Sequence, residues 1–234
     1  MKHYFSLLAL IFLLTSCGGD PSENSMLLTG EVRGLKKGSL YLQKVSDTAY
    51  VTLDSLIVDG SAVFSFSEEI TAPEVYYLTL TFQDSSNTIK RLPFFAEVGN
   101  VTVHTTLENY ERDAQITGSA NQEILNQYKI LMKRYNDKNL DLLKEGFDAL
   151  KAGNDSMVSA NKAQQDKLLK NRYLASVNFA MNNGAYEVAP YITLNEIFDV
   201  NTKYLDTIYT SLTPKIKDSK YGKALESYIT ERKN

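Results

Sequence analysis

The sequence is poor in the residues that carry redox and metal chemistry. Among its 234 residues there are one cysteine, two histidines and no tryptophan. If Cys17 is acylated, as its context predicts, the folded part has no thiol, which excludes disulfides, thiolate catalysis and cysteine-ligated metals. Removal of a signal peptide would leave His104 as the single imidazole, so a metal site built on several histidines is excluded too. We therefore expect no cofactor.

The sequence also lacks a long apolar run and an excess of basic residues. The apolar run from Tyr4 to Leu14 is too short to span a bilayer as a stable helix. The formal net charge is −3, with acids and bases interspersed, so there is no electrostatic footprint for nucleic acid and no polybasic patch for anionic lipid. A hydrophobic content of 43% is nevertheless enough for a folded core.

The amino terminus has the layout of an export signal, with a charged start, an apolar stretch and small residues before a break. Leu14-Thr15-Ser16-Cys17 resembles the bacterial lipobox, in which the cysteine is acylated and becomes the first residue of the mature protein. This predicts a signal peptide over residues 1–16, lipidation of Cys17 and a flexible Gly/Pro/Ser tether over residues 17–25. The predicted location is the cell envelope at the outer membrane, with the periplasmic face and the cell surface both open. The alternative is an ordinary cleaved signal peptide with an incidental cysteine.

From Met26 to about Gly118 the hydrophobic period is two, which indicates strands with one buried face. Asp59-Gly60 lies between two β-prone runs and predicts a hairpin with a type I′ turn. Seven or eight short antiparallel strands at this spacing predict a β-sandwich or open barrel over residues 26–118.

After Gly118 the period changes to that of helices. Ser119 and Gln122 fit a capping box, in which each side chain would satisfy a backbone N–H of the other. Amphipathic segments follow to the end of the chain, and their expected core residues include Tyr128, Tyr135, Leu142, Leu143, Phe147, Leu150 and Tyr209. Strands followed by helices predict an α+β protein with a helical domain over residues 119–234.

Several segments are similar to the characteristic sequence motifs of one family. They are Leu27–Val32, Gly38–Leu42, Leu53–Ser55, Val58–Phe64, Glu97–Val101 and Ile116–Asn121. They resemble the domain of unknown function 4369, found in lipoproteins of the Bacteroidetes type. The resemblance implies a β domain, a helical spacer (similar to Asn178–Asn183 and Tyr221–Leu225) and then a thioredoxin-like domain. We expect no such domain here, because the sequence has no Cys-x-x-Cys and stops at Asn234.

The candidate catalytic residues lack the neighbouring functional groups that catalysis requires. His104 would need a nucleophile and an orienting acid, and Ser55 with Asp54 is the nearest choice, but nothing places the three together. Glu68 and Glu69 are adjacent on a strand and point to opposite faces. The spacing of Asp137, Asp141, Asp148 and Asp155 is not that of a calcium loop. Fifteen tyrosines suggest sugar stacking, but many fall on helix core stripes, so packing explains them first.

Four Asp-Ser or Asp-Thr pairs followed by a methyl-bearing residue resemble the O-glycosylation sequon of exported proteins in the same bacterial group. The candidate hydroxyls are those of Thr48, Ser55, Ser156 and Thr207, with Thr48 and Ser55 favoured. Turn and cap chemistry also favours such pairs, which is the competing interpretation.

Taken together, the sequence predicts a lipid-anchored envelope protein without catalytic activity, acting as a binding or scaffolding module. The alternative is an accessory subunit of a separate thioredoxin-like oxidoreductase.

Overall fold

The structure, a computed structural model, describes residues 24–82 and 88–233. The predicted signal peptide, Cys17 and all of the predicted tether except its last two residues lie outside the described residues. Of those two, Asn24 lies in a turn and Ser25 is already the first residue of a strand.

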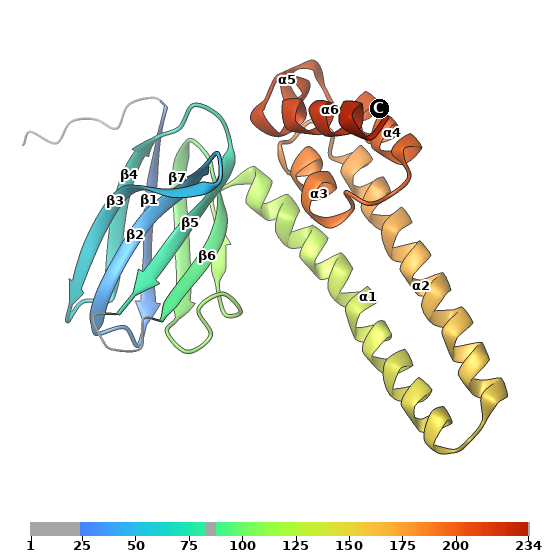
Figure 1. Cartoon of the computed structure of the whole chain (residues 1–234). Coiled ribbons are helices and arrows are strands. Elements are labelled where there is room, and N and C mark those ends of the chain that lie inside the picture. Colours follow the sequence, from blue (N-terminus) through green and yellow to red (C-terminus); the bar gives the residue numbers. More distant parts are fainter. Residues whose placement is uncertain (1–23, 83–87, 234) are drawn as a thin grey trace, which may run out of the picture.

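Within the described residues, eight strands form two packed four-stranded sheets in the amino-terminal half (Figure 1). One sheet has the order β4-β1-β7-β8 and consists of β1 (Ser25–Arg33), β4 (Val63–Glu69), β7 (Gly99–Thr106) and β8 (Gln115–Thr117). The other has the order β3-β2-β5-β6 and consists of β2 (Lys37–Ser46), β3 (Ala49–Asp59), β5 (Glu74–Thr81) and β6 (Ile89–Ala96). All pairs are antiparallel except β1 with β7, which is parallel. The predicted α+β fold, with a largely antiparallel β-sandwich before a helical domain, is confirmed, and the β1–β7 pair makes one of the two sheets mixed.

Alternation along the strands builds the sandwich core. In β1, Met26, Leu28 and Val32 are fully buried, and the residue that would continue this row is Gly30. A Cβ at Gly30 would lie 1.9 Å from the carbonyl oxygen of Val103, so only glycine fits here. Inward residues of the other strands close the core, including Leu40, Leu42, Phe64, Phe66, Leu78, Leu80, Phe94, Val101 and Val103.

The predicted hairpin at Asp59-Gly60 is wrong. Gly60 does adopt a positive φ of 95°, as a turn glycine does. However, β3 pairs with β2 while β4 pairs with β1, so the chain crosses here from one sheet to the other. The backbone N–H of Gly60 donates to the carbonyl of Lys36, and this bond holds the crossing against the β1–β2 connection. The Asp-Gly signal thus marks a change of direction without a pairing of its flanking strands.

Six helices follow in the described part of the chain: α1 (Ala120–Lys151), α2 (Asp155–Asn182), α3 (Val188–Glu196), α4 (Thr202–Ser211), α5 (Pro214–Lys217) and α6 (Lys220–Lys233). The hydroxyl of Ser119 accepts from the N–H of Gln122 at 3.1 Å and caps α1. The polar segment Asn136–Asn139 does not interrupt α1, which runs through it for 32 residues. Gly153, with φ 64°, and the cap Asn154 then reverse the chain into α2.

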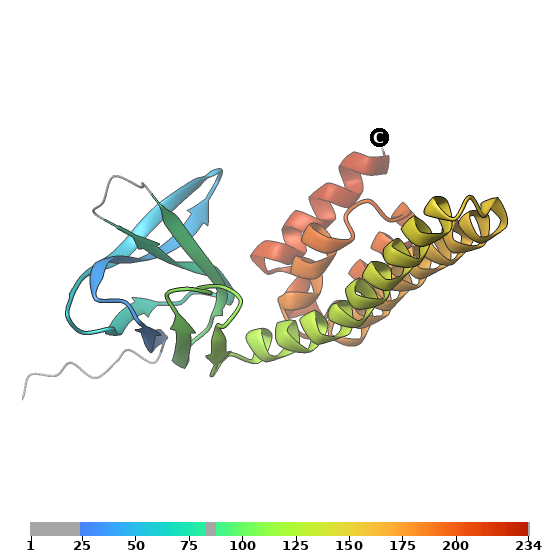
Figure 2. The same ribbon diagram turned by 90° about the horizontal axis from the view of Figure 1, so that it is seen from below.

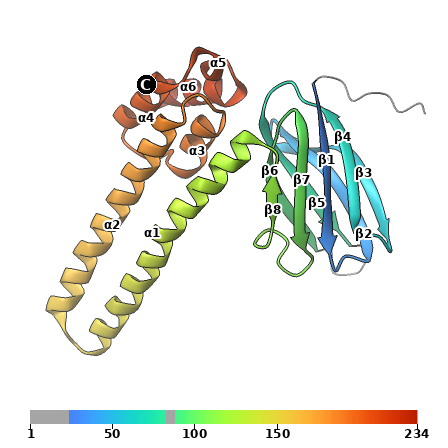
Figure 3. The same ribbon diagram turned by 180° about the vertical axis from the view of Figure 1, so that it is seen from behind.

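The helices divide into a compact part and a projecting arm. One cluster packs residues of α2, α4 and α6, among them Ala180, Leu205, Ile208 and Leu225. Beyond it α1 and α2 continue as an antiparallel hairpin, which we call the arm, and its closed end points away from both the β domain and α3–α6 (Figures 1, 2 and 3). None of the described helices is both long and apolar enough to cross a membrane.

Candidate functional site

The two domains meet at a junction where buried polar side chains join strands to helices. Gln122, in the first turn of α1, is fully buried, and its Oε1 accepts from the backbone N–H of Phe95 in β6 at 2.9 Å. The predicted capping box is therefore only half formed, because Gln122 contacts the β domain instead of reaching back to Ser119. The capping pattern was visible in the sequence, but its tertiary partner was not.

A second connection runs through Asn121, which is also buried. Its Nδ2 donates to Glu97 at 2.6 Å and to Glu187 at 3.1 Å, and its Oδ1 accepts from the backbone N–H of Val188 at 2.8 Å. One amide thus joins the end of β6, the start of α1 and the start of α3. Fully paired buried polar groups are geometrically demanding, so such a network favours one relative orientation of the elements that it joins.

Aromatic packing completes the junction. Phe95, Tyr191 and Tyr221 form mutual edge contacts with ring centroids 5.3–6.3 Å apart. The hydroxyl oxygen of Tyr221 accepts from the backbone N–H of Val75 in β5 at 2.9 Å. Nearby, the ammonium of Lys220 in α6 lies 2.5 Å from the carboxylate of Glu74. Burial raises the pKa of Tyr191 to about 12, with Tyr77 and Glu196 adding to the rise.

Two cavities flank this junction. One, of about 690 Å³, lies beside Gly118 and is lined by Asn24 and Pro73 of the β domain together with Glu97, Glu187, Lys215 and Asp218. The other, of about 460 Å³, lies between β6 and the first half of α1. Its floor is apolar (Phe94, Leu125, Tyr128, Met132) and its rim is charged (Glu111, Lys129, Lys133, Arg172, Glu196). We call it the α1 pocket; its size and its apolar floor are typical of ligand sites.

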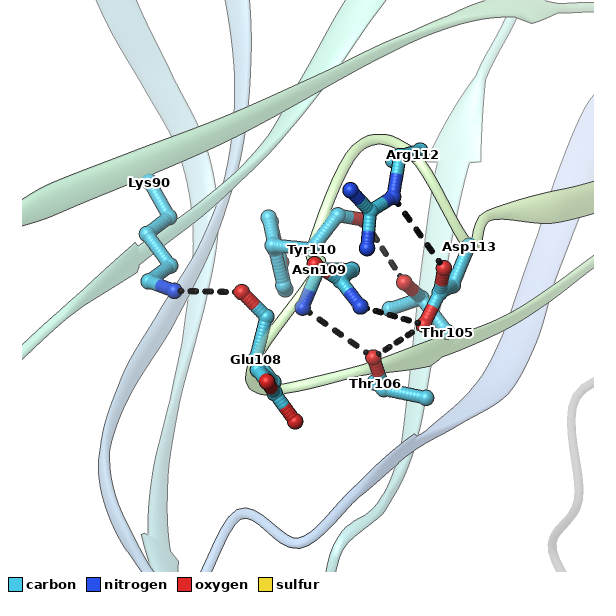
Figure 4. A network of polar contacts seen from close by, with 8 residues as sticks. All are labelled: Lys90, Thr105, Thr106, Glu108, Asn109, Tyr110, Arg112 and Asp113. Carbon is cyan, nitrogen blue, oxygen red and sulfur yellow. Dashed lines mark hydrogen bonds and ion pairs between the residues drawn. The ribbon is translucent and has the colours of Figure 1, made fainter.

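The loop between β7 and β8, which carries Glu111 to the rim of the α1 pocket, is held by its own polar network (Figure 4). Asp113 accepts from the hydroxyl of Thr106 at 2.8 Å and from the amide of Asn109 at 3.2 Å. These bonds, followed by the charge of Arg112, hold the pKa of Asp113 below its usual value. The ammonium of Lys90 fixes the start of the loop by donating to the carbonyl of Leu107 at 2.6 Å. These bonds hold the loop that carries Glu111.

The structure does not bring the sequence-predicted catalytic candidates together. His104 is exposed on β7, in register with Glu31 and Gln115, and lines a shallow polar hollow of about 440 Å³. Asp54 and Ser55 lie on β3 in the other sheet. Glu68 is half-buried and Glu69 exposed, as opposite faces of β4 require. Asp137, Asp141, Asp148 and Asp155 are exposed on the arm, and among the described residues no three acidic, histidine or cysteine side chains are grouped as metal ligands.

The four candidate glycosylation hydroxyls are all on exposed residues. Thr48 lies in the β2–β3 turn and Ser55 on β3. Ser156 lies in the first turn of α2, whose cap is Asn154. Thr207 lies within α4, where its hydroxyl donates to the carbonyl of Lys203 at 2.7 Å.

The expected helix core is only partly correct. Tyr128 and Leu142 are buried, and Tyr135 and Tyr209 are partly buried. Leu143, Phe147 and Leu150, however, are exposed on the arm, together with Leu140. Periodicity identifies a common face but does not show whether anything covers it.

The β-sandwich, the helical domain and the polar junction define a two-domain α+β protein with a projecting helical arm. Residues 26–125 match the family model described as a domain of unknown function, DUF4369. This match spans the β domain and the first turns of α1, the part of the chain in which most of the family-like sequence motifs lie. No curated protein matches the chain. A solved structure titled pT26-6p is similar at 10% identity and a TM-score of 0.23, over 85% of this chain and 42% of that one. This chain thus spans less than half of that protein's length, and the likeness carries no argument about the fold.

Proposed function

We propose that this protein is a lipid-anchored envelope module that binds or scaffolds another molecule and has no catalytic activity of its own. The observation that supports this proposal is the junction, where Gln122, Asn121 and the Phe95–Tyr191–Tyr221 cluster join the β domain to the base of the arm. A buried network of this kind holds a long arm at a defined angle from the sandwich, which is what presenting a binding surface requires.

The anchor rests on the lipobox at Leu14–Cys17. Two or three acyl chains on Cys17 would hold the protein at a bilayer surface without help from a basic patch. In cells, the native protein should fractionate with membranes, and its intact mass should exceed that of residues 17–234 by the mass of the acyl groups. The Cys17→Ser variant should lose the mass of the acyl groups. A wild-type protein with an unmodified Cys17 would contradict the anchor.

The binding role is tested by photocrosslinking in whole cells. A photoreactive amino acid is placed in turn at Asn136 and Phe147 on the arm, at Pro73 beside the larger junction cavity and at Ser65 on the β-sandwich. We expect crosslinks to another envelope molecule from at least one of the first three positions, and not from Ser65. A thioredoxin-fold partner would indicate the accessory role in thiol–disulfide exchange. No crosslink from any position would contradict a binding or scaffolding function.

We further propose that the protein is O-glycosylated at one or more of the four sequons, with Thr48 and Ser55 favoured. Exposure of both residues supports this, whereas the hydroxyl of Thr207 is engaged by its own helix. An added mass on the native protein that falls in Thr48→Ala or Ser55→Ala would support the proposal. A mass explained by peptide and lipid alone would overturn it.

A further inference from the structure

The outer half of α1 exposes a row of large apolar side chains. Leu140, Leu143, Phe147 and Leu150 are exposed to 64%, 39%, 62% and 60%. They are separated by three, four and three residues, so they lie on one side of the helix. We call these four residues the apolar row. Four large apolar side chains exposed together on one helix face are characteristic of a binding surface.

The hairpin contact with α2 does not use this row. The α1 residues that face α2 are Leu142, Gly146 and Ala149. The amide of Asn161 donates to the carbonyl of Leu142 at 2.8 Å, and a Cβ at Gly146 would lie 2.8 Å from the Oδ1 of Asn161. The close approach of α2 at Gly146 fixes which side of α1 is covered, and it leaves the apolar row outside.

The apolar row is continuous with the α1 pocket. Leu125, Met132 and Asn136 of α1 line that pocket, and steps of seven and four residues connect them along the same side of the helix to Leu140. At 1.5 Å per residue, the distance from Leu125 to Leu150 is roughly 38 Å. The surface is therefore a track that begins at a cavity between the domains and ends near the tip of the arm.

Lysines predominate among the charges of α1 beside the track, and the acids there are Asp137, three residues before Leu140, and Glu111 and Glu196 at the rim of the α1 pocket. Lys129, Lys133, Lys144 and Lys151, which we call the lysine row, are exposed and lie three or four residues from members of the track. Three acids come directly after a residue of the apolar row or the lysine row: Asp141, Glu145 and Asp148. One position along an α-helix is a rotation of about 100° around its axis, so each acid points away from the residue that it follows. Lys133 pairs with Asp137 at 2.5 Å, whereas Lys129, Lys144 and Lys151 make no ion pair within the described residues. Since the whole chain has a net charge of −3, this basic strip is local.

We propose that the apolar row, the lysine row and the α1 pocket together bind an amphipathic helix with acidic flanks, supplied by a partner protein. This inference rests on the proposed binding function and names its surface and its partner chemistry. Helices are recognised in this way through apolar anchors three, four and seven residues apart, and the pocket accommodates one bulky side chain. Glutamates or aspartates beside those anchors meet the lysine row. A second copy of this chain is disfavoured as occupant, because its own lysine row would face this one.

The test uses full-length protein carrying Cys17→Ser, so that no detergent is needed. The probes are two fluorescent helical peptides of about 21 residues, or ~30 Å. Both have leucines at heptad positions a and d; one has glutamates and the other lysines at the flanking positions. Fluorescence anisotropy should show that the glutamate peptide binds on the order of tenfold or more tighter than the lysine peptide. The preference should weaken with salt and reverse in a Lys144→Glu/Lys151→Glu variant.

The apolar contribution is tested with a matched pair of variants. Phe147→Asp should weaken binding of the glutamate peptide by about tenfold or more. Ile130→Asp should leave it unchanged, because Ile130 is equally exposed (61%) on the same helix but lies on another side. Circular dichroism of both variants checks that α1 stays folded.

Several outcomes would overturn the proposal. The first is equal affinity for the two peptides, or no effect of Phe147→Asp. The second is binding to phosphatidylglycerol vesicles that depends on Phe147 while both peptides are ignored, which would assign the surface to lipid. The third is a Phe147-dependent dimer in analytical ultracentrifugation, which would assign it to a second copy. If position 73 crosslinks to a partner in cells but neither peptide binds in vitro, this inference would be contradicted while the proposed scaffolding function would still stand.

Discussion

At the scale of single residues, the junction depends on side chains whose partners are far away in sequence. Gln122 is the clearest case, because it is fully buried and accepts from the N–H of Phe95 across the domain boundary. In Gln122→Ala that N–H would lose its partner in a buried site. We expect the free energy of unfolding to fall by about 1–3 kcal/mol, as measured by urea denaturation.

The matched control is Gln127→Ala, one and a half turns further along α1, where the side chain is exposed. It should change the free energy of unfolding by less than about 0.5 kcal/mol. Equal losses in the two variants would show that the contact with Phe95 adds nothing of its own, because Ala is the better helix former and helix propensity alone would not destabilise either variant.

The tyrosines of the junction predict a loss of stability in alkali. Burial raises the pKa of Tyr191 from 10.0 to about 12. Because the unfolded chain releases this proton first, the stabilising contribution is complete below pH 10 and is lost as the pH rises from about 10 to about 12. The free energy of unfolding should therefore fall over this range, as followed by urea denaturation at a series of pH values.

In Tyr191→Phe this decline should be shallower, while stability at pH 8 stays close to that of the wild type, since no hydrogen bond of the Tyr191 hydroxyl is found within the described residues. Tyr221, whose pKa burial also raises, should account for part of the decline that remains. Identical pH profiles for wild type and variant would show that Tyr191 titrates as it does in the unfolded chain.

At the scale of secondary-structure elements, the sequence shows the type of each long segment better than its partner. Alternation in residues 26–118 correctly predicts strands, and the switch of period after Gly118 correctly predicts helices. The Asp59-Gly60 hairpin fails because a turn signal is local, whereas strand pairing is decided by which sheet buries each apolar face. The short helices α3 and α5 lack enough turns to show a period.

In the arm, too, the sequence does not show which apolar residues are covered by a neighbouring element. Leu142, Leu143, Phe147 and Leu150 look alike in sequence, yet only Leu142 is buried. Which of them faces α2 is set by the close contact at Gly146 and Asn161, a tertiary detail. Sequence periodicity therefore identified most of the apolar row, but it predicted these residues to be buried in the core.

Local stability should follow this division of the arm. The base of α1 buries Ile124, Leu125, Tyr128 and Met132, whereas its outer half buries only Leu142 and Ala149. A helical hairpin with so few buried apolar contacts opens readily. In hydrogen-exchange mass spectrometry, amides of residues 140–151 should exchange on the order of tenfold or more faster than those of residues 124–132. Uniform protection along α1 would contradict this.

At the scale of the whole molecule, the first described residues and the tip of the arm lie at opposite ends. β1 begins at the end of the sandwich nearer to α5 and α6. The α1–α2 turn lies at the opposite end of the molecule, away from the sandwich (Figures 1 and 3). Asn24 is seven residues after Cys17, and a chain of this length reaches at most about 25 Å. The 32 residues of α1 span roughly 48 Å. If Cys17 is acylated, we expect the arm to point away from its own bilayer, toward partners in the surrounding compartment.

This orientation can be measured on the lipidated protein in vesicles. With Cys17 acylated, Gly153→Cys and, in a second sample, Ala72→Cys each supply a single thiol for a fluorophore, at the tip of the arm and beside the Asn24 end. Quenchers on lipid headgroups act over short distances, so they should dim the label at residue 72 and leave the label at residue 153 unchanged. Quenching at residue 153 equal to that at residue 72 would mean that the arm lies on the membrane. The lysine row and the apolar row would then face lipid, and an acidic helix could not be their partner.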